Sequence, residues 1–297
     1  MVRQVGEGRQ ATARSESQPF EVWRPAAWTS PVVYAVPHSG TYYPGDLVSA
    51  TSLDRLTLRK SEDAFVDQLF RPALAAGSPL IKVNYARVYL DVNREPYELD
   101  PQMFEDPLPP EANTTSLRVA GGLGTIARVV ADGAEVYRGK LRFEVAEERV
   151  ARIYRPYHEA LAGLLQGARA RFGFAVLIDC HSMPSMGLAQ GDGRRRADVV
   201  LGDRFGTSCA AALTELAELL FRNEKLAVAR NNPYAGGFTT YHYGRPPEGI
   251  HALQIELNRA LYMDEERIAK RPGFATLAAS LERVTAGLSG LTADPAG

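Results

Sequence analysis

The sequence has few of the residues that would place it in a specialised class of protein. Only two of its 297 residues are cysteines, Cys180 and Cys209, too few for a disulfide framework and consistent with a reducing, cytoplasmic setting. The formal net charge is −1 with a pI near 6.5, so no field of one sign is available to hold nucleic acid or an anionic membrane. No run approaches the ~20 apolar residues of a membrane-spanning helix. We therefore expect a soluble globular protein with a large buried core.

The first 20 residues are expected to be a poorly ordered tail. They are polar and lack the apolar centre of a signal peptide. Residues 21–297 contain no internal repeat and no linker-like stretch, so they are expected to form a single domain.

Short apolar runs alternate with amphipathic segments along the chain. Strands are predicted at 31–37, twice within 80–94, and at 174–182, 198–203, after 226, and 251–259. Helices are predicted over 52–76 (with a break at 59–62), 138–173, 206–224, and in the C-terminal tail, where Pro272 and Gly273 interrupt it. Loops are predicted over 95–115, 121–125 and the Gly/aromatic stretch that ends at 244. The alternation predicts a layered α/β architecture.

Polar side chains collect where these strands end. His38 and His181 each follow an apolar run, and ligands of open α/β sheets bind at the carboxyl ends of the strands. Glu256 interrupts the apolar alternation of 251–259, where a carboxylate is costly unless it is paired, bound to a metal or functional. This pattern predicts that the two imidazoles meet over one site.

Two imidazoles and one carboxylate, with a water in the fourth position, are a common catalytic zinc set. The carboxylate could come from Glu62 or Asp63, with Asp67 a weaker candidate, and Glu256 has the context of a general base. The residues alone leave plainer interpretations open. Either histidine could be a hydrogen-bonded structural residue, and Glu256 could form a salt bridge with Arg259 or Arg87.

The neighbours of these residues have structural interpretations. Cys180 should face away from a site that contains His181, because adjacent strand residues point to opposite faces. Asp179 shares the face of His181 and could orient its imidazole or form a strand-end turn. His158 is expected to be a packing or surface residue, and His251 a loop residue.

Six segments in order, PHSGTYYP, SEDAFVDQLF, ARVYLDVNRE, LIDCHSMPS, NNPYAGGFTTYHYG and ALQIELNRALYMDE, resemble the N-formylglutamate amidohydrolase family. They span residues 31–265, most of the chain. The resemblance implies a three-layer α/β/α fold with a central mixed sheet, similar to the zinc carboxypeptidases and aspartoacylase, and one zinc ion per chain. It also implies hydrolysis of the formamide of N-formyl-glutamate to formate and glutamate, the last step of one histidine-degradation route. It leaves a homo-oligomer open.

The resemblance also assigns roles to residues. His38 and His181 are implied as zinc ligands, with Asp63 slightly ahead of Glu62 as the acidic ligand and Glu256 as the general base. An arginine is implied to stabilise the oxyanion or a substrate carboxylate. The residues implied to act on the substrate are Arg87, Asn93, Arg94, Gly237, Thr239, Tyr241 and His242.

One residue departs from the family pattern. Tyr241 stands where an arginine is expected in members that act on formylglutamate, which removes one anchor for a dicarboxylate. The substrate could therefore be another N-formyl or N-acyl amino acid. Two further alternatives are a metal-binding homologue without activity and a zinc hydrolase of a small peptide or cell-wall amide.

Overall fold

The protein is built around one seven-stranded sheet, in the strand order β1-β3-β2-β4-β7-β5-β6. The computed structural model describes residues 18–130, 133–185 and 197–295. The strands are β1 (Phe20–Trp23), β2 (Val32–Val36), β3 (Leu80–Val83), β4 (Ala175–Met183), β5 (Val199–Gly202), β6 (Val228–Arg230) and β7 (Ile250–Asn258). A separate hairpin pairs β8 (Met263–Asp264) with β9 (Ala269–Lys270). The expected tail lies outside the described residues up to residue 17, and β1 already begins at Phe20.

The sheet is mixed. Strands β3, β2, β4 and β7 run parallel to one another, whereas β1 is antiparallel to β3, and β5 is antiparallel to β7. The carboxyl ends of β2, β4 and β7 therefore lie at one edge of the sheet, where ligand sites form in folds of this kind.

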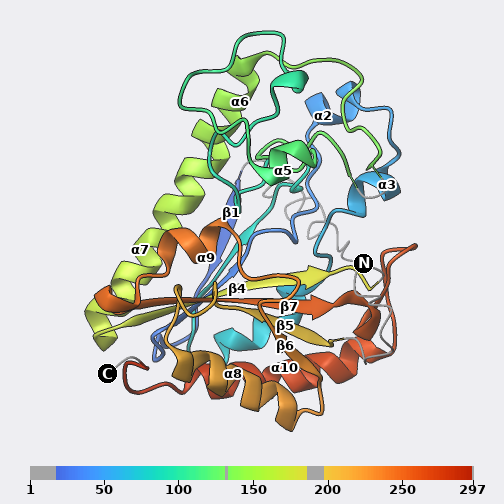
Figure 1. Cartoon of the computed structure of the whole chain (residues 1–297). Coiled ribbons are helices and arrows are strands. Elements are labelled where there is room, and N and C mark those ends of the chain that lie inside the picture. The colour runs from blue at the N-terminus through green and yellow to red at the C-terminus, as the bar shows by residue number, and fades with distance from the viewer. Residues whose placement is uncertain (1–17, 131–132, 186–196, 296–297) are drawn as a thin grey trace, which may run out of the picture.

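Helices cover both faces of the sheet (Figure 1). One face carries α7 (Arg155–Phe172) and α9 (Phe238–Tyr243); α7 continues upward in Figure 1 through a π-helical turn (Val150–Tyr154) into α6 (Phe143–Arg149), which lies above the sheet. The other carries α4 (Val66–Leu69), α8 (Ala211–Asn223) and α10 (Gly273–Ser289). Shorter helices are α2 (Gly45–Ala50), α3 (Arg55–Arg59), α5 (Leu117–Ala120) and the 3₁₀ turns Arg71–Leu74, Pro101–Met103, Pro246–Glu248 and Arg259–Leu261. The expected α/β/α layering around a mixed sheet is confirmed.

Alternation along the strands produces one apolar core on each face. In β2, Val33 and Ala35 pack in the core under α7, and Val32 and Tyr34 pack in the core of α8 and α10. All four side chains are fully buried, as expected for a central strand covered on both faces. Cys180 belongs to the second core, so it faces away from the side of His181 as predicted.

Several predicted elements differ from the observed ones. Within 80–94 only β3 is a strand, because the chain after Val83 turns across the carboxyl edge of the sheet. The predicted helix 52–76 is interrupted after α3, as the expected break indicated, and resumes only after Phe65, whose φ of 67° is left-handed. The residues expected to form the Gly/aromatic loop instead form α9 at 238–243.

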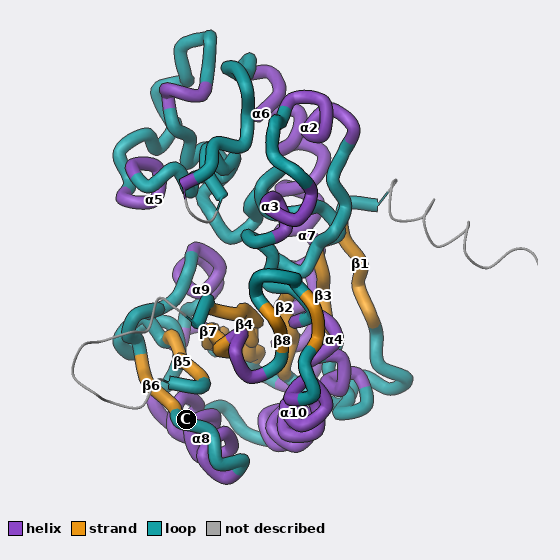
Figure 2. Tube along the Cα trace, turned by 90° about the vertical axis from the view of Figure 1, so that its right-hand side faces the viewer, coloured by secondary structure: helices purple, strands orange, loops and turns teal. Residues whose placement is uncertain are grey.

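Other boundaries moved for local reasons. The helix predicted from 138 begins at Phe143 and ends, as expected, at Gly173, whose φ of 88° stops it. The helix predicted from 206 begins at Ala211, because a turn occupies the preceding residues. The loop expected to run over the surface at 95–115 is partly buried, and Leu99 lies in the core. Figure 2 shows that this region, above the sheet, is mostly loop.

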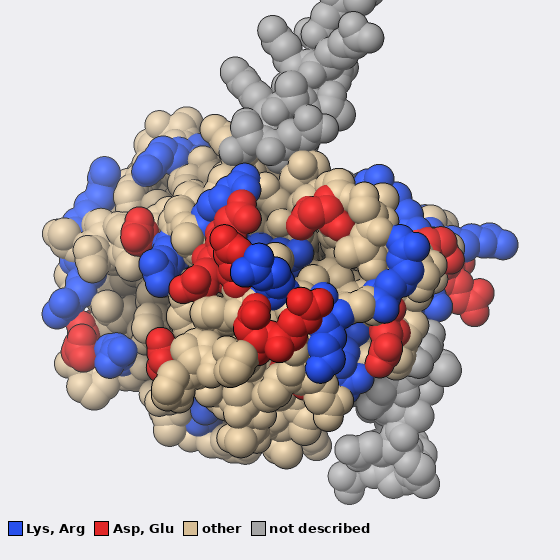
Figure 3. All heavy atoms as spheres, turned by 90° about the horizontal axis from the view of Figure 1, so that it is seen from above, with Lys and Arg blue, Asp and Glu red and all other residues tan. Residues whose placement is uncertain are grey.

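His251 is not the loop residue that was expected. It lies inside β7, fully buried, and its Nε2 is 2.9 Å from Asp294 Oδ1. Among the described residues, no helix is long and apolar enough to cross a membrane. On the face seen from above, basic and acidic side chains are interspersed (Figure 3), in keeping with the net charge of −1.

Candidate metal centre and catalytic cavity

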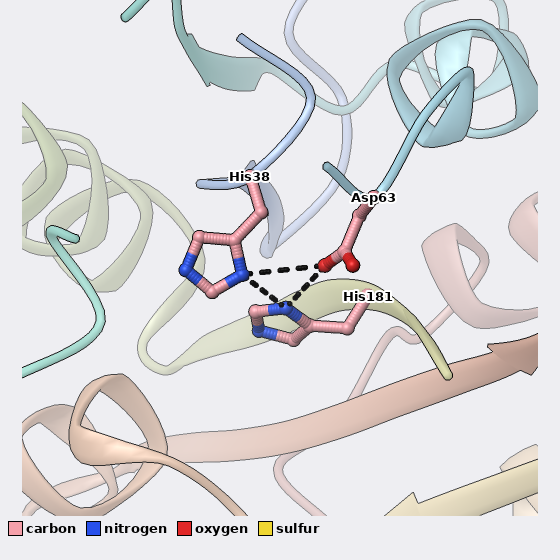
Figure 4. Close-up of side chains that lie close together, drawn as sticks. All are labelled: His38, Asp63 and His181. Carbon is pink, nitrogen blue, oxygen red and sulfur yellow. Dashed lines mark hydrogen bonds and ion pairs between the residues drawn. The ribbon is translucent and has the colours of Figure 1, made fainter. Parts of the chain in front are cut away.

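Three buried side chains from separate parts of the chain converge at the carboxyl edge of the sheet (Figure 4). His38 follows β2, His181 lies near the end of β4, and Asp63 lies in the turn before α4. The two Nδ1 atoms are 3.1 Å apart. Asp63 Oδ2 lies 3.2 Å from Nδ1 of His38 and 3.0 Å from Nδ1 of His181. The predicted meeting of the two histidines is confirmed.

Backbone contacts explain how Asp63 reaches the histidines. Its amide donates to the carbonyl of His38 at 3.0 Å, and the Ser39 hydroxyl donates to its carbonyl at 2.7 Å. The left-handed Phe65 turns the chain away immediately afterwards. The turn is therefore fastened to the end of β2.

A close backbone approach places residues 87–94 beside the cluster. Tyr42 and Tyr85 form a parallel bridge, and a Cβ at Gly40 would lie 2.1 Å from the Tyr85 carbonyl oxygen. Only glycine leaves room for this crossing. The chain that follows Tyr85 brings Asp91 and Asn93 to the histidines.

A carboxylate contacts the outer nitrogen of each imidazole. Asp91 Oδ1 lies 2.7 Å from Nε2 of His38, and Asp179 Oδ1 lies 3.0 Å from Nε2 of His181. The Asn93 amide nitrogen is also 3.0 Å from His181 Nε2. A carboxylate beside Nε2 favours a ring proton at that nitrogen, which leaves the Nδ1 lone pair to face the centre. The contact expected between Asp179 and His181 is present, whereas the role of Asp91 was not foreseen.

Arg259, which the sequence suggested only as a partner of Glu256, instead contacts the second oxygen of Asp63. Arg259 Nη2 donates to Asp63 Oδ1 at 3.1 Å, and Ser182 Oγ donates to the same oxygen at 3.3 Å. Arg259 had been considered only as a salt-bridge partner for Glu256. Its position directly after β7 was the available signal, because the carboxyl end of that strand adjoins the cluster.

Charges inside the cluster shift its titration. Burial alone would raise the pKa of Asp63, but contacts with His181 and His38 hold that pKa well below its usual range. Burial alone would lower the pKa of His181, but Asp179 and Asp63 raise it well above 6.5. Burial would also raise the pKa of Asp91, which Arg94, His38 and Arg87 hold well below its usual range. The raised pKa of His181 favours the protonated imidazole next to the Asp63 carboxylate.

The donor set fits a tetrahedral metal ion. Two nitrogens and one oxygen lie 3.0–3.2 Å apart, and ligand atoms of a tetrahedral zinc site are about 3.3 Å apart. Two imine lone pairs facing each other beside a carboxylate oxygen repel unless a cation or proton lies between them. The arrangement is completed by carboxylates at both outer nitrogens, as in metal sites generally.

A cavity of about 670 Å³ opens next to the cluster. Glu256 lines it from β7, directly opposite His181 of β4 in the strand register. Burial raises the pKa of Glu256 to about 7. Gln254 fixes this carboxylate, because its Nε2 donates to Glu256 Oε1 at 3.0 Å while its Oε1 accepts from the Gly237 amide at 2.7 Å. Gln254 was missed, although it shares the strand face of Glu256.

The cavity wall is rich in cations and also has an apolar part. Its basic residues are Lys60, Arg87, Arg94, Arg118 and Arg259. Its apolar side chains include Val88, Leu123, Ala127, Val129 and Val130. Asp63, Asp91 and Glu256 line the same cavity, and the first two pair with Arg259, Arg87 and Arg94. The N–H donors that these pairs leave open can receive an anionic ligand, and the apolar wall can receive a hydrocarbon group.

Some of the predicted substrate-binding residues line this cavity and others lie outside it. Asn93, Arg94 and Gly237 line the cavity. Tyr241 and His242 were expected to line it, but they lie on the exposed side of α9, against a second cavity. Helical periodicity explains this difference, since a helix that buries Thr239 turns the residues two and three positions later outward.

Glu62 also lies away from the histidines. Its Oε1 accepts from the Tyr43 hydroxyl at 2.7 Å, and Arg59 Nη2 donates to its Oε2 at 3.0 Å. Asp67 forms an ion pair of 2.9 Å with Lys82. Of the three acidic candidates, the structure brings only Asp63 to the histidines.

The fold and the cluster define a class of protein: a layered α/β protein whose site carries a metal-type donor set over the carboxyl ends of its strands. The family model described as N-formylglutamate amidohydrolase matches residues 30–263. The chain belongs to this family of amide-bond hydrolases.

Similar proteins agree with this assignment. The chain is 31% identical over 240 residues to an N-formylglutamate deformylase of Pseudomonas aeruginosa, covering 80% of this chain and 83% of that protein. It is 29% identical over 238 residues to the N-formylglutamate deformylase of Pseudomonas putida, covering 79% and 82% of the two chains. The crystal structure of N-formylglutamate amidohydrolase from Ralstonia eutropha JMP134 superposes with a TM-score of 0.85 at 37% identity, over 90% of this chain and 95% of that one.

Proposed function

We propose that the protein is a metal-dependent amidohydrolase that cleaves N-formyl-glutamate, or a closely related N-acyl amino acid, to the carboxylic acid and the free amino acid. The observation that carries this proposal is the convergence of three ligand atoms from His38, Asp63 and His181 beside the buried Glu256. The activity named for the related Pseudomonas and Ralstonia proteins supports the choice of substrate. The proposed catalytic unit is a single domain over residues 21–297.

His38, His181 and Asp63 are the proposed ligands of one zinc ion, each offering one atom. Zinc bound there would polarise an amide carbonyl and acidify a water molecule. Asp91 and Asp179 keep the two imidazoles in the tautomer that presents Nδ1. Glu62 is left out of this set, because its carboxylate is taken by Tyr43 and Arg59.

Glu256 is the proposed general base and acid. Its carboxylate takes a proton from the attacking water and delivers it to the nitrogen of the leaving amine. A pKa raised to about 7 by burial suits a group that must both accept and return a proton near neutral pH. Gln254 holds one oxygen of this carboxylate and leaves the other for the water.

Arg87 is the proposed oxyanion stabiliser. Its Nη2 donates to Asp91 Oδ2 at 2.7 Å, and its side chain remains partly open to the cavity. A guanidinium has five N–H donors, so donors remain for the oxygen that gains charge as the amide is attacked.

The cavity cations are the proposed anchors for the substrate carboxylates. Arg94 and Arg118 line the wall next to Leu123, and Lys60 lines it near Asp63. Arginine pairs with a carboxylate through two parallel hydrogen bonds. Because Tyr241 lies outside this cavity, a tyrosine at that position does not remove an anchor from it. Asn93 serves in positioning, since its amide already contacts His181, Asp179 and the Thr239 backbone.

The size of the cavity favours a second candidate, hydrolysis of a larger N-acyl amino acid. A volume of about 670 Å³ lies within the range of cavities that hold drug-sized ligands. Such a cavity is larger than a single N-formyl amino acid requires. The apolar wall around Leu123 and Val129 would receive the acyl chain. Comparing turnover of N-formyl-, N-acetyl- and N-hexanoyl-glutamate at matched concentrations separates the two candidates.

The proposal is tested by zinc content and turnover in matched variants. Asp63→Asn should lose zinc, while Glu62→Gln should retain about one zinc per chain, because only Asp63 points at the histidines. Glu256→Gln should retain zinc and lose nearly all hydrolysis of N-formyl-glutamate. Full zinc in Asp63→Asn would exclude the ligand set, and substantial turnover by Glu256→Gln would exclude the base.

The remaining assignments extend the same proposal. Formate and glutamate as products would place the reaction at the end of a histidine-degradation route. Two free buried cysteines, Cys180 and Cys209, support a reducing compartment such as the cytoplasm.

A further inference from the structure

A second cavity, of about 430 Å³, lies on the outer side of α9 and is separate from the cavity beside the histidines. Its walls are the turn that follows β5 and the exposed side of α9. The lining residues are Arg204, Thr207, Ser208, Tyr241, His242, Gly244 and Arg245. We propose that this cavity is a second binding site, specific for a small oxyanion such as a carboxylate or a phosphate.

The charge of the residues that line this cavity favours an anionic ligand. Two of the lining residues are arginines, one is a histidine, three bear hydroxyls (Thr207, Ser208 and Tyr241), and none of them bears a carboxylate. The nearby Asp203 points away from the cavity: its Oδ1 accepts from Asn231 and the Gly206 amide, and its Oδ2 accepts from Thr214. Burial and then the charge of Arg245 lower the pKa of His242. The cavity therefore has a positive potential that the neighbouring acid does not cancel.

The two guanidinium groups are placed with donors to spare. Arg204 lies 5.0 Å over the Tyr241 ring, and its Nη1 donates to the Gly236 carbonyl at 3.2 Å. Arg245 Nη2 donates to the His242 carbonyl at 3.2 Å. Each guanidinium has five N–H donors, so these contacts orient the groups and still leave several N–H bonds for a ligand. A planar fork of this kind matches the oxygens of carboxylates and phosphates.

The turn that presents Arg204 is strained. Arg204 and Phe205 both have left-handed φ values, of 51° and 57°, before Gly206 at 81°. Residues other than glycine adopt this region only when the surroundings require it, and such positions concentrate at ligand-binding sites. This turn places the Arg204 guanidinium over the Tyr241 ring of α9 and leaves the Phe205 side chain 79% exposed. On stability grounds alone a relaxed turn would be preferred, which supports a role in binding.

His242 is held in place from behind. Its ring stacks on Phe238 with the centroids 5.0 Å apart and an angle of 21° between the planes. The hydroxyl of Ser208 is fixed by the Ala252 carbonyl at 2.8 Å, and that of Thr207 by the Arg204 carbonyl at 2.8 Å. The walls are thus ordered before any ligand enters, which reduces the entropy lost on binding.

The test measures binding of inorganic phosphate and, separately, of succinate to the zinc-loaded protein by calorimetry at constant ionic strength. Arg245→Gln is the informative variant, because Arg204 also supports Gly236 on the wall of the first cavity. Arg283→Gln is the matched control, since it removes one exposed arginine charge from α10 on the opposite face of the sheet.

We expect a saturable phase of one oxyanion per chain that weakens at least tenfold in Arg245→Gln and changes less than twofold in Arg283→Gln. Tighter binding of phosphate identifies a phosphorylated ligand, and tighter binding of succinate identifies a carboxylate. Binding of an anion at the zinc site would be unchanged in Arg245→Gln, so it is distinguished from binding at the second cavity. The proposal is overturned if neither probe saturates, or if Arg245→Gln and Arg283→Gln bind both probes equally.

Discussion

Each histidine of the cluster depends on what its outer nitrogen touches. Asp179 lies 3.0 Å from Nε2 of His181 and accepts from Asn93 at its other oxygen. We predict that Asp179→Asn lowers zinc affinity by about 10- to 100-fold, because an amide no longer favours the tautomer that presents Nδ1. Chelator competition measures this affinity. Asp67→Asn is the control, since Asp67 pairs with Lys82 and touches neither histidine.

If Asp179→Asn and Asp67→Asn bound zinc as tightly as the unmodified protein, the carboxylate at Nε2 would be a packing residue only. A small loss of zinc affinity in both variants would point to a general charge effect, because each variant removes one negative charge from the protein.

His158 couples the fold to pH away from the cluster. Its Nε2 donates to the Val92 carbonyl at 2.9 Å, its Nδ1 accepts from the Tyr243 hydroxyl at 2.8 Å, and burial lowers its pKa to about 4. A lowered histidine pKa gives stability that is present above pH 6.5 and is lost as the pH falls towards 4. The loss is at most about 3 kcal/mol, at about 1.4 kcal/mol per pKa unit.

His158→Gln should remove this pH dependence, because glutamine does not titrate. Urea unfolding at several pH values measures the difference. The free energy of unfolding of the unmodified protein should fall more steeply below pH 6.5 than that of the variant, and parallel curves would contradict the assignment.

At the scale of elements, α9 transmits packing to the metal centre. A Cβ on Gly237 would lie 2.7 Å from the Asn93 amide atoms, although its φ of −84° suits any residue. We predict that Gly237→Ala destabilises the protein by about 1–3 kcal/mol through overpacking and also weakens zinc binding, because Asn93 contacts His181. Gly163→Ala, in an exposed and open position of α7, should instead stabilise by about 0.5–1 kcal/mol.

Urea unfolding and chelator competition test both variants. Lost stability with unchanged zinc affinity in Gly237→Ala would mean that the helix packs on the site without positioning it.

The elements that could be predicted are those set by local pattern. β2, β4 and β7 were placed within two residues, because the apolar runs of β2 and β4 and the apolar alternation of β7 are patterns typical of strands. Residues 84–94 were mistaken for a strand because they too are apolar, yet their course depends on the distant crossing at Gly40. The same limit applied to α9, which packs on β7 although its sequence, FTTYHY between flanking glycines, is rich in β-branched and aromatic residues that favour a helix only weakly.

The site was predictable to the same extent. His38 and His181 follow apolar runs that identify two neighbouring strands, so the meeting of the two side chains could be predicted from the sheet. The choice between Glu62 and Asp63 could not be made from adjacent positions, since it depends on Arg59 and Arg259, which claim one carboxylate each through the folded chain.

At the scale of the whole molecule, the proposed metal centre would couple zinc binding to protonation and to stability. Burial opposes a charged His181, but Asp179 and Asp63 raise its pKa well above 6.5. A raised histidine pKa gives stability that is fully present below pH 6.5 and is lost as the pH rises through the folded value. Burial also raises the pKa of Glu256 from 4.5 to about 7, so rising pH between these values costs the folded state further stability.

Zinc reverses this trend, because the proposed ligands bind it only when the Nδ1 atoms are unprotonated, and zinc affinity therefore rises with pH. We predict that the difference in Tm between zinc-loaded and metal-free protein widens from about pH 6 to about pH 8, as the metal-free form loses stability and the loaded form gains binding energy. Calorimetric scans of both forms measure it. In Glu256→Gln this Tm difference should still increase with pH, but by less, because His181 still exchanges a proton for the metal. A Tm difference that does not change with pH in the unmodified protein would mean that no proton leaves the cluster when zinc binds.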